Sequence, residues 1–424
     1  MIGLIGMSHL GIDSGMAFAA RGFEVLGFDP DAQLTAKLND FKYPIFEPGL
    51  EELHRAHQKK IRFSSRGEDL AACDLVYFSF DVPTNAHNQS DLGKVRLMIE
   101  EFSADLKPGT IFVVLAQVPP GFCRSLLPAM EKRGLVLYYQ VETLIFGQAV
   151  DRAMNPERYM VGCVDPQKPL PAVFQSLLKA FSCPILPMKL ESAELAKISI
   201  NFYLTSTVTV TNVLAEACER IGADWQEIAP AMRLDKRIGP FAYLTPGLGL
   251  AGGNLERDLV TIQSLSAEHG TESSIVDAWL LNSRSRRDWM LRTLHREVLR
   301  EQPRAKMALW GLAYKIGTHS LKNAPSLRLL SAARGVDAQA YDPEAKLPPE
   351  VQAATCRQVG SPLEAAKGAH ALLVFTPYSE FKAIDPRELK KVMAGPHVLD
   401  PFQVLNQKAM LEAGFRLHSL GRSL

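Results

Sequence analysis

A glycine-rich turn near the start of the chain could hold the phosphates of a dinucleotide. The apolar run MIGLI leads into Gly6-Met7-Ser8-His9-Leu10-Gly11, which matches the pattern GxGxxG except at its middle position. The outer glycines would allow a tight turn and close packing of the following helix. Serine is the next smallest residue and could add a hydroxyl donor. We therefore expect the cofactor at this turn, on Gly6, Ser8, His9, Leu10 and Gly11.

An acidic residue follows the turn at the distance that ribose recognition requires. Asp29 ends the second apolar run, FEVLGFD, eighteen positions beyond Gly11. Its carboxylate could accept both hydroxyls of the adenosine ribose and would repel a 2′-phosphate, so NAD is predicted rather than NADP. The alternative is an ordinary strand-to-helix turn with Asp29 before Pro30. The order of strand, glycine turn, helix and acid favours NAD binding.

Three further polar side chains stand where a ligand could reach them. Lys197 and Asn201 lie four residues apart in a segment of helical periodicity, so they share one helix face. Glu142 follows the apolar run LVLYYQV, and open α/β sheets bind ligands beyond the carboxyl ends of their strands. The alternatives are a solvated lysine and a salt-bridged loop acid.

The run GLGLAGGNLERD combines four glycines with a terminal acid. Gly247, Gly249, Gly252 and Gly253 would let backbone N–H groups approach a ligand closely, whereas the alternative is a flexible surface loop. Asp258 closes the run, and a helix N-cap is a second role open to it.

These residues need a scaffold of alternating strands and helices. Short apolar runs alternate with helix-like segments up to about residue 187, strand signals stop between about 188 and 300, and the alternation returns from 301 to 424. We predict two Rossmann-like doubly wound parallel-sheet α/β domains, 1–187, which contains the NAD-binding turn, and 301–424. A helical central domain, 188–300, would join them.

Charge and cysteine usage exclude several classes of protein. The 424 residues carry a net charge of +1, which gives no broad field for nucleic acid or an anionic membrane. The six cysteines lack the close pairing of a zinc site or CxxC motif, so we predict reduced thiols and no metal site. With no leader-like start and no apolar stretch near ~20 residues, we predict a cytoplasmic protein without a membrane span.

Ten further segments extend in order along nearly the whole chain: PIFEPGLEEL (44–53), VPPG (118–121), ETLIFGQAVD (142–151), AELAKISIN (193–201), DKRIG (235–239), GLGLAGGNLERD (247–258), GLAYKIGT (311–318), YDP (341–343), TPYSEF (376–381) and DPFQVL (400–405). In their shared order and spacing they resemble the UDP-glucose/GDP-mannose (nucleotide-sugar) 6-dehydrogenases. This likeness implies a homodimer formed through the helical middle, NAD as cofactor, and a nucleotide sugar, preferably a UDP-sugar, as substrate, bound by the domain 301–424. Members of the family oxidise a sugar CH₂OH to a carboxylate with two NAD per sugar.

The resemblance assigns roles residue by residue. Lys197 and Asn201 fall on a catalytic pair that would hold a water or an oxyanion as charge develops. Glu142 and Asp258 fall on acids of the site. Further positions would contact the cofactor, Gln117 and Lys322, or the substrate, Leu144, Arg237, Gly247, Gly249, Gly253 and Lys315, with Arg237 reaching across the dimer interface.

The chain departs from the family pattern at one stage of the reaction. Asn254 stands where the family carries the cysteine that forms a thioester, and an amide nitrogen is not nucleophilic. Gln117 replaces a threonine that helps bind a water, and Phe146 replaces a glutamate of thioester hydrolysis.

Lys322 replaces an arginine near the cofactor, giving a point charge in place of a planar fork.

No other cysteine suits the missing role. Cys218 lies 21 residues beyond Lys197, roughly 30 Å if one helix is unbroken. Cys123 falls inside the helix expected after Pro119 and Pro120.

The leading hypothesis is one reversible hydride transfer between a nucleotide-sugar alcohol and its aldehyde or ketone, with Asn254 hydrogen-bonding the carbonyl oxygen or a water. Two alternatives remain open at this point. One is an epimerase or dehydratase that oxidises and re-reduces the sugar on tightly held NAD. The other is a non-catalytic nucleotide-sugar-binding protein.

Overall fold

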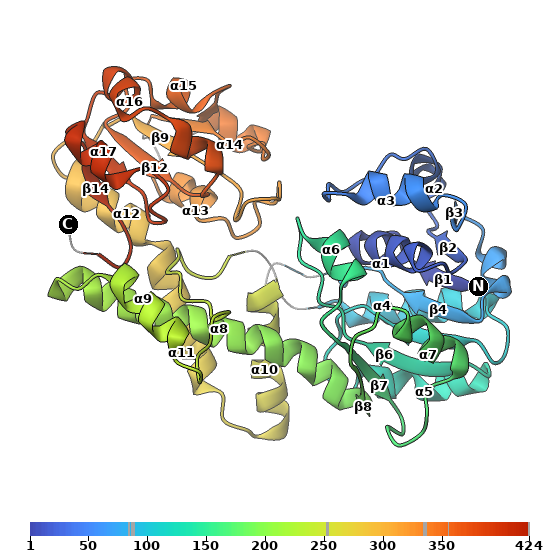
Figure 1. Ribbon diagram of the computed structural model, residues 1–424. Helices are drawn as coiled ribbons and strands as arrows, with labels where there is room; N and C mark the ends of the chain where they lie inside the picture. Colours follow the sequence, from blue (N-terminus) through green and yellow to red (C-terminus); the bar gives the residue numbers. More distant parts are fainter. Residues whose placement is uncertain (84, 86–89, 252–253, 334–336, 355, 423–424) are drawn as a thin grey trace. The chain divides into compact units, whose positions relative to one another are not determined.

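The computed structural model describes residues 1–424 except 84, 86–89, 252–253, 334–336, 355 and 423–424. The chain divides into two compact units, Met1–Ile200 and Asn201–Leu424, and each is described by itself (Figure 1). Helix α8 (Leu190–Ile221) begins in the first unit and ends in the second. None of the helices in the described parts of the chain combines the length and apolar character that crossing a bilayer requires.

An eight-stranded sheet forms the centre of the first unit, in the order β3-β2-β1-β4-β5-β6-β7-β8. Its first six strands are parallel and follow the order 3-2-1-4-5-6 of a dinucleotide-binding fold, so the order reverses between β1 and β4. β7 runs antiparallel to β6, and β8 is parallel to β7. The strands are β1 (Ile2–Ile5), β2 (Val25–Phe28), β3 (Ile61–Ser64), β4 (Leu75–Phe78), β5 (Ile111–Val114), β6 (Val136–Gln140), β7 (Tyr159–Cys163) and β8 (Ile185–Lys189).

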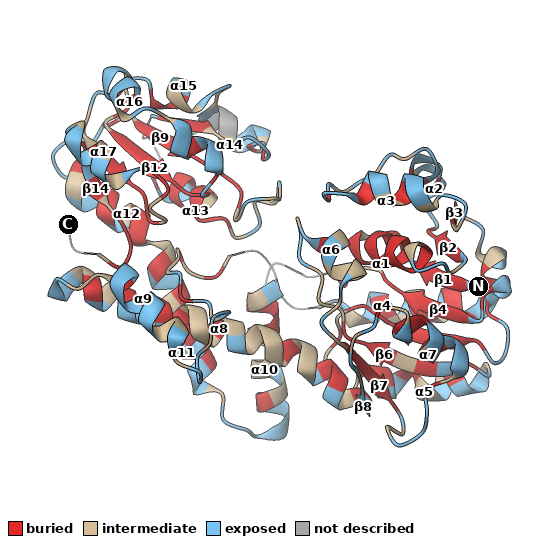
Figure 2. Cartoon of the chain, viewed as in Figure 1, coloured by how far each residue is buried: buried red, intermediate tan, exposed pale blue. Residues whose placement is uncertain are grey.

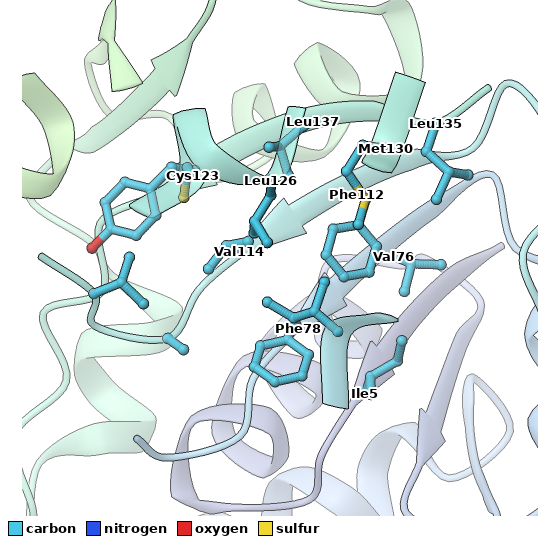
Figure 3. Packing of buried hydrophobic residues seen from close by; sticks show 14 of the residues in the cluster. Ile5, Val76, Phe78, Phe112, Val114, Cys123, Leu126, Met130, Leu135 and Leu137 are labelled. Carbon is cyan, nitrogen blue, oxygen red and sulfur yellow. The ribbon is translucent and has the colours of Figure 1, made fainter. Parts of the chain in front are cut away.

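Helices cover both faces of this sheet because alternate residues of its central strands point to opposite sides. Figure 2 shows that the strands of this sheet are largely buried. Phe112 and Val114 of β5 join one buried cluster (Figure 3), and Ile111 and Val113 join another. The helices are α1 (His9–Ala20), α2 (Ala32–Asn39), α3 (Leu50–His57), α4 (Leu92–Phe102), α5 (Phe122–Lys132), α6 (Ala149–Met154) and α7 (Ala172–Lys179), with short turns η1 (Gly67–Ala72) and η2 (Ser103–Asp105).

The second unit pairs a helical segment with a six-stranded parallel sheet of the same plan, in the order β11-β10-β9-β12-β13-β14. Its strands are β9 (Met307–Trp310), β10 (Ala338–Tyr341), β11 (Arg357–Gln358), β12 (Ala371–Val374), β13 (His397–Leu399) and β14 (Arg416–His418). The helical segment contains the end of α8, α9 (Trp225–Leu234), α10 (Asn254–His269), α11 (Ser274–Arg287), α12 (Trp289–Leu294) and the π-helical turn η3 (His295–Leu299). Around the sheet lie α13 (Pro325–Ala332), α14 (Pro349–Ala354), α15 (Pro362–Ala366), η4 (Ser379–Ala383), α16 (Pro386–Val392) and α17 (Gln407–Glu412).

The predicted fold class is confirmed: two doubly wound sheets with helices between them in the sequence. Two strands extend the first sheet beyond the expected parallel core: β7, which is antiparallel to β6, and β8, which is parallel to β7. The three-part domain division stays a prediction.

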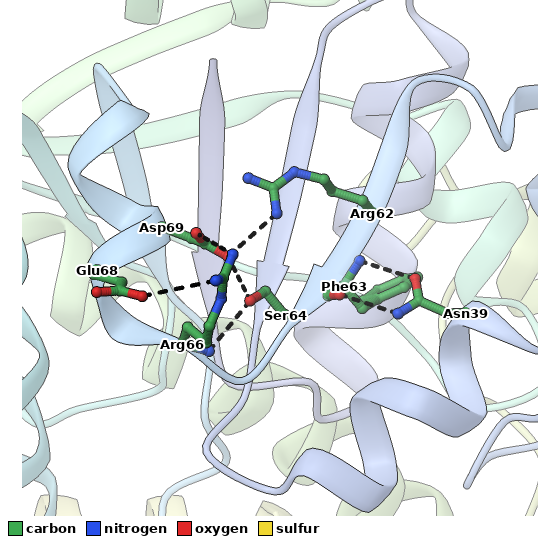
Figure 4. A network of polar contacts seen from close by, with 7 residues as sticks. All are labelled: Asn39, Arg62, Phe63, Ser64, Arg66, Glu68 and Asp69. Carbon is green, nitrogen blue, oxygen red and sulfur yellow. Dashed lines mark hydrogen bonds and ion pairs between the residues drawn. The ribbon is translucent and has the colours of Figure 1, made fainter.

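A polar network holds the edge strand β3 in place (Figure 4). Asp69 accepts hydrogen bonds from Ser64 Oγ at 2.6 Å and from Arg66 at 3.1 Å, while the Asn39 amide bonds both backbone groups of Phe63. The carbonyl of Ser64 in turn accepts from the backbone N–H of Asp29 at 3.2 Å. The network therefore supports the end of β2, where the predicted ribose-binding acid lies.

Candidate active site

The turn between β1 and α1 accepts only glycine at its two ends. Gly6 has φ +99°, and a Cβ there would lie 2.6 Å from the Phe80 ring. A Cβ on Gly11 would lie 2.0 Å from the carbonyl oxygen of Gly6. The helix therefore packs directly on the turn, and the N–H groups of its first turn, which have no intrahelical acceptor, can face an anion.

Ser8 caps α1, and its hydroxyl already has a partner. Its Oγ accepts from the N–H of Leu10 at 3.2 Å and donates to the carbonyl of Ser79 at 2.7 Å. A hydroxyl has one hydrogen to donate. The sequence predicted that Ser8 would donate a hydrogen bond to a phosphate. In the structure its single hydroxyl hydrogen instead bonds the carbonyl of Ser79 and holds α1 to the end of β4.

Asp29 lies buried at the end of β2, beside the glycine turn. Oδ2 accepts from the N–H of Met7 at 2.8 Å, and Oδ1 accepts from the N–H of Asp31 at 3.0 Å. Each carboxylate oxygen has a further lone pair that can accept a ribose hydroxyl. The glycine turn, the helix start and this acid together fit an NAD molecule.

His9 lies in a buried cluster of acids that the sequence did not predict. Its Nε2 is 3.1 Å from Oε1 of Glu47 and 3.2 Å from Oδ2 of Asp13, and its ring stacks on Phe146 at 4.1 Å between centroids. Glu47 also accepts from the N–H groups of Gly147 and Ala149. Burial, reinforced by the nearby charge of Glu47, raises the pKa of Asp13 to about 8. The histidine therefore ties α1 to the segment after β6 through its side chain.

Lys197 and Glu142 meet beyond the end of β6. The Nζ of Lys197 donates to the backbone carbonyl of Glu142 at 2.6 Å. Burial raises the pKa of the Glu142 carboxyl, and the positive charge of Lys197 opposes that shift. The structure thus brings together two of the predicted catalytic residues within the first unit.

Asn201 and Asp258 form a second pair, in the second unit. The Nδ2 of Asn201 donates to Oδ2 of Asp258 at 2.6 Å, and Oδ1 of Asp258 lies 3.4 Å from Nε of Arg257. Asp258 is 2 % exposed. It lies in the second turn of α10, so the alternative role as a helix N-cap is wrong: the helix already begins at Asn254.

Asn254 is exposed at the first position of α10, one turn before Asp258. Residues four apart share a helix face. The amide of Asn254 and the carboxylate of Asp258 therefore lie on the same side of α10.

The glycine-rich run before α10 is anchored rather than flexible over the residues described. The N–H of Gly247 donates to Oδ1 of Asn212 at 2.8 Å, and that of Leu250 donates to Oγ of Ser283 at 2.8 Å. Gly249 has φ +80°, and a Cβ there would lie 2.4 Å from the carbonyl of Ser283. The predicted Gly252 and Gly253 lie outside the described residues.

The remaining predicted binding residues lie on the surface or near it. Arg237 has a side chain that is 89 % exposed and pairs with Asp235 at 2.6 Å. The Nζ of Lys315 lies 5.8 Å from the centre of the Tyr314 ring. Lys322 is exposed, whereas Gln117, which follows β5, and Leu144 are half-buried. Leu144 packs against the core on one face of the first sheet.

All six cysteines are free, and burial raises the pKa of each thiol. The pKa of Cys73 rises to about 11 and that of Cys356 to about 12, and the pKa values of the others rise as well: Cys123, Cys163, Cys183 and Cys218. Cys123 is buried in α5, and α8 runs unbroken to Ile221, as predicted. A thiol with a raised pKa is a poor nucleophile at neutral pH.

Sequence reasoning missed the residues that support the site. Asp13, Asn212 and Ser283 carried no motif, since their partners are distant in the chain. Glu47 lies in the segment PIFEPGLEEL, to which no role is assigned from the sequence. Its position directly before Pro-Gly in that segment is the sequence feature that could have indicated it.

The fold and the glycine turn define an NAD-dependent oxidoreductase, and comparison with known proteins defines the class further. Sequence profiles of the UDP-glucose/GDP-mannose dehydrogenase family match residues 1–182 (NAD binding domain), 191–283 (central domain) and 308–407 (UDP binding domain). The chain belongs to this family, and it is an oxidoreductase acting on a CH–OH group of a nucleotide sugar.

Similar proteins span the whole chain. It is 28 % identical to a UDP-glucose 6-dehydrogenase of Pseudomonas aeruginosa, over 99 % of this chain and 97 % of that protein. It is 27 % identical to the UDP-glucose 6-dehydrogenase TuaD of Bacillus subtilis, over 99 % and 93 %. The fold is shared with a UDP-glucose dehydrogenase of Pyrobaculum islandicum, with a TM-score of 0.85 and 23 % identity over 100 % of this chain and 98 % of the other.

Proposed function

We propose that this dehydrogenase carries out one reversible hydride transfer between a nucleotide-sugar alcohol and its aldehyde, without a covalent thioester. The observation that carries the proposal is Asn254 at the start of α10, where the family pattern has its cysteine. An amide nitrogen does not attack an aldehyde. Oxidation without that attack ends after two electrons.

The bonds and charges balance without a nucleophile. An NAD⁺ held by the glycine turn and Asp29 would supply the acceptor for the hydride that leaves the sugar carbon. The hydroxyl proton passes to the carboxylate of Asp258, directly or through a water, and a C=O bond forms. Lys197 and Asn201, one turn apart on α8, stabilise the charge that develops on the oxygen.

The neighbouring contacts support these roles. Nε of Arg257 lies 3.4 Å from Oδ1 of Asp258, so a positive charge stands beside the proposed proton acceptor. In the reverse direction the same proton returns from Asp258 to the oxygen, while Glu142, whose pKa is raised by burial, can hold a proton at the end of β6. The Asn254 amide can donate a hydrogen bond to the carbonyl oxygen of the product or to a water beside it.

The proposed loss of the thioester step is consistent with two other observations. Phe146, where the family pattern has a glutamate, stacks on His9 and is therefore used in packing. The six cysteines offer no replacement thiolate, because burial raises all their pKa values.

For the substrate we propose a UDP-sugar. The match of residues 308–407 to a UDP binding domain and the names of the relatives support a uridine nucleotide. Lys315 and Arg237 would contribute positive charge toward its diphosphate, with Arg237 supplied by a second subunit.

We further propose a homodimer formed through α8. Large apolar side chains recur along one face of this helix at intervals of seven, four and seven residues: Tyr203, Val210, Leu214 and Ile221, all exposed, Tyr203 and Ile221 to 75 %. Isolated soluble chains rarely expose such a continuous apolar face. Light scattering should give a dimer, and Val210→Asp a monomer; an unchanged mass for this variant would contradict the assignment.

A stoichiometric assay tests the function. The purified chain is incubated with NAD and a panel of UDP- and GDP-sugars, NADH is measured by absorbance, and the product is analysed by mass spectrometry. The proposal predicts one NADH per sugar and an aldehyde-level product, trapped by a hydroxylamine. Two NADH per sugar with a uronate overturns it. Sugar conversion without net NADH also overturns it and would identify an epimerase or dehydratase. Binding without turnover overturns it as well and would identify a non-catalytic binding protein.

A further inference from the structure

Two histidines and a glutamate from three separate elements meet on one face of the second sheet. His397 begins β13, His418 ends β14 and Glu297 lies in the π-helical turn η3. The register pairs His397 with Arg416 and Leu399 with His418, so the two imidazoles project from the same face. Val298, next to Glu297, packs in the core on that face.

The donor atoms of the three side chains are close enough to share a ligand. One ring nitrogen of each histidine and one carboxylate oxygen of Glu297 all lie within 4.8 Å of one another. The two rings are stacked at 5.8 Å with 11° between their planes. Small side-chain rotations would bring the donors to the separation of about 3.3 Å that bonds of about 2.0–2.1 Å impose at tetrahedral zinc.

The imidazoles have unused hydrogen-bonding capacity. Nδ1 of His397 and Nε2 of His418 are buried, and neither has a hydrogen-bond partner among the described residues. Buried ring nitrogens in proteins normally have one. A bound ion would satisfy such a set.

The charges around the cluster balance. Arg296 pairs with Glu297 at 2.6 Å, and the other charges acting on the histidines are those of Arg416 and Glu301. Two cations therefore face two anions, which leaves no net repulsion of an added cation.

The donor set selects a class of metal. Imidazole nitrogens favour Zn²⁺ and its transition-metal neighbours, whereas Mg²⁺ and Ca²⁺ prefer oxygen ligands. Three protein donors leave a fourth position for water. We propose that Glu297, His397 and His418 form a zinc-class divalent metal site that ties η3 to the edge of the second sheet.

This site is independent of the proposed reaction. None of its residues belongs to the predicted catalytic or binding residues. Its role is to fasten the turn that ends the helical segment to β13 and β14. Metal that binds only the folded chain raises its stability by mass action.

The test uses the full chain after removal of metal with a chelator. Zn²⁺ is titrated by calorimetry, and Co²⁺ is added separately to record the visible absorption of tetrahedral cobalt. His418→Gln and Glu297→Gln keep the side-chain size and remove a donor, and thermal unfolding without metal checks that each variant folds. His269→Gln, an exposed histidine at the end of α10, is the matched control.

We expect one Zn²⁺ per chain, an affinity at least about tenfold weaker in both cluster variants, and no change in the control. Mg²⁺ at the same concentration should not compete. Cluster variants that bind Zn²⁺ as tightly as the unaltered chain, or an unaltered chain that binds none, would overturn the proposal.

Discussion

Asn201 donates from Nδ2 to Oδ2 of Asp258 at 2.6 Å, which fixes the orientation of both side chains. A carboxylate only accepts, so the amide nitrogen must face it and the amide oxygen must point away. Helices α8 and α10 thus each contribute half of one polar pair. The proposed chemistry depends on this hydrogen bond, because it holds Asp258, the proposed base, beside Asn201, which would stabilise the alkoxide.

Asp258→Asn tests the proposed base. The variant keeps the shape of the side chain but loses its charge and basicity, so kcat should fall by about 10²- to 10⁴-fold while the affinity for NAD is unchanged. Initial rates and fluorescence titration with NADH measure the two effects. Asp277→Asn, at an exposed position on α11, is the matched control and should retain full activity. A tenfold or smaller loss in Asp258→Asn would remove this residue from the proposed mechanism.

Asn254→Cys tests the position at the start of α10. A thiol there should attack the aldehyde, and a second oxidation should leave the sugar bound as a thioester. Because Phe146 cannot assist hydrolysis, we expect a burst of up to two NADH per active site, then slow turnover. Mass spectrometry of the intact chain detects the adduct, and Asn254→Ser serves as the control without a thiol. Absence of any adduct on a folded, active variant argues against this placement.

Asp29→Asn tests the cofactor preference. Removing the charge takes away the repulsion of a 2′-phosphate and weakens the bonds to the ribose hydroxyls. NAD affinity should fall about tenfold, and the ratio of NADP to NAD affinity should rise. Fluorescence titration with both reduced cofactors measures the change, with the exposed Asp40→Asn as control. An unchanged ratio would contradict the role of Asp29.

Asp13→Asn tests the buried acid beside His9. Its pKa rises from 3.8 to about 8, so between about pH 4 and 8 the folded chain retains a proton that the unfolded chain has released. Stability from this group is complete below about pH 4 and is lost as the pH rises through 8. The stability of the unaltered chain relative to Asp13→Asn should therefore fall with pH, by at most about 1.4 kcal/mol per pH unit.

Urea unfolding at intervals from pH 5 to 8 measures this difference. The exposed Asp40→Asn should give a curve parallel to that of the unaltered chain. Parallel curves for Asp13→Asn as well would mean that Asp13 ionises normally in the folded chain.

The strands that sequence could predict are those buried on both faces. The apolar runs MIGLI and FEVLGFD are confirmed as β1 and β2. β3 (IRFS), β8 (ILPMK) and β14 (RLH) were not anticipated, because they carry charged residues or a proline and lie at or near sheet edges. Edge strands have little apolar pattern to detect.

The residues of the candidate site also fall into two groups, those that the sequence could predict and those that it could not. The glycine turn and Asp29 follow from local spacing, so the chain alone indicated them. The bonds of Lys197 to Glu142 and of Asn201 to Asp258 join residues more than fifty positions apart, and no spacing rule gives such contacts. The proposed metal ligands at 297, 397 and 418 are as widely separated, which is why we predicted no metal site. The cytoplasmic location stays a prediction.

The burial of the cysteines has a consequence for how such an enzyme is switched off. A dehydrogenase that depends on a thiolate is inactivated by peroxide, because sulfenic acid forms on its nucleophile. Five of these six thiols are buried and the sixth, Cys183, is half-buried, all with raised pKa values. With an amide at the start of α10, we expect the proposed sugar oxidation to resist inactivation by peroxide.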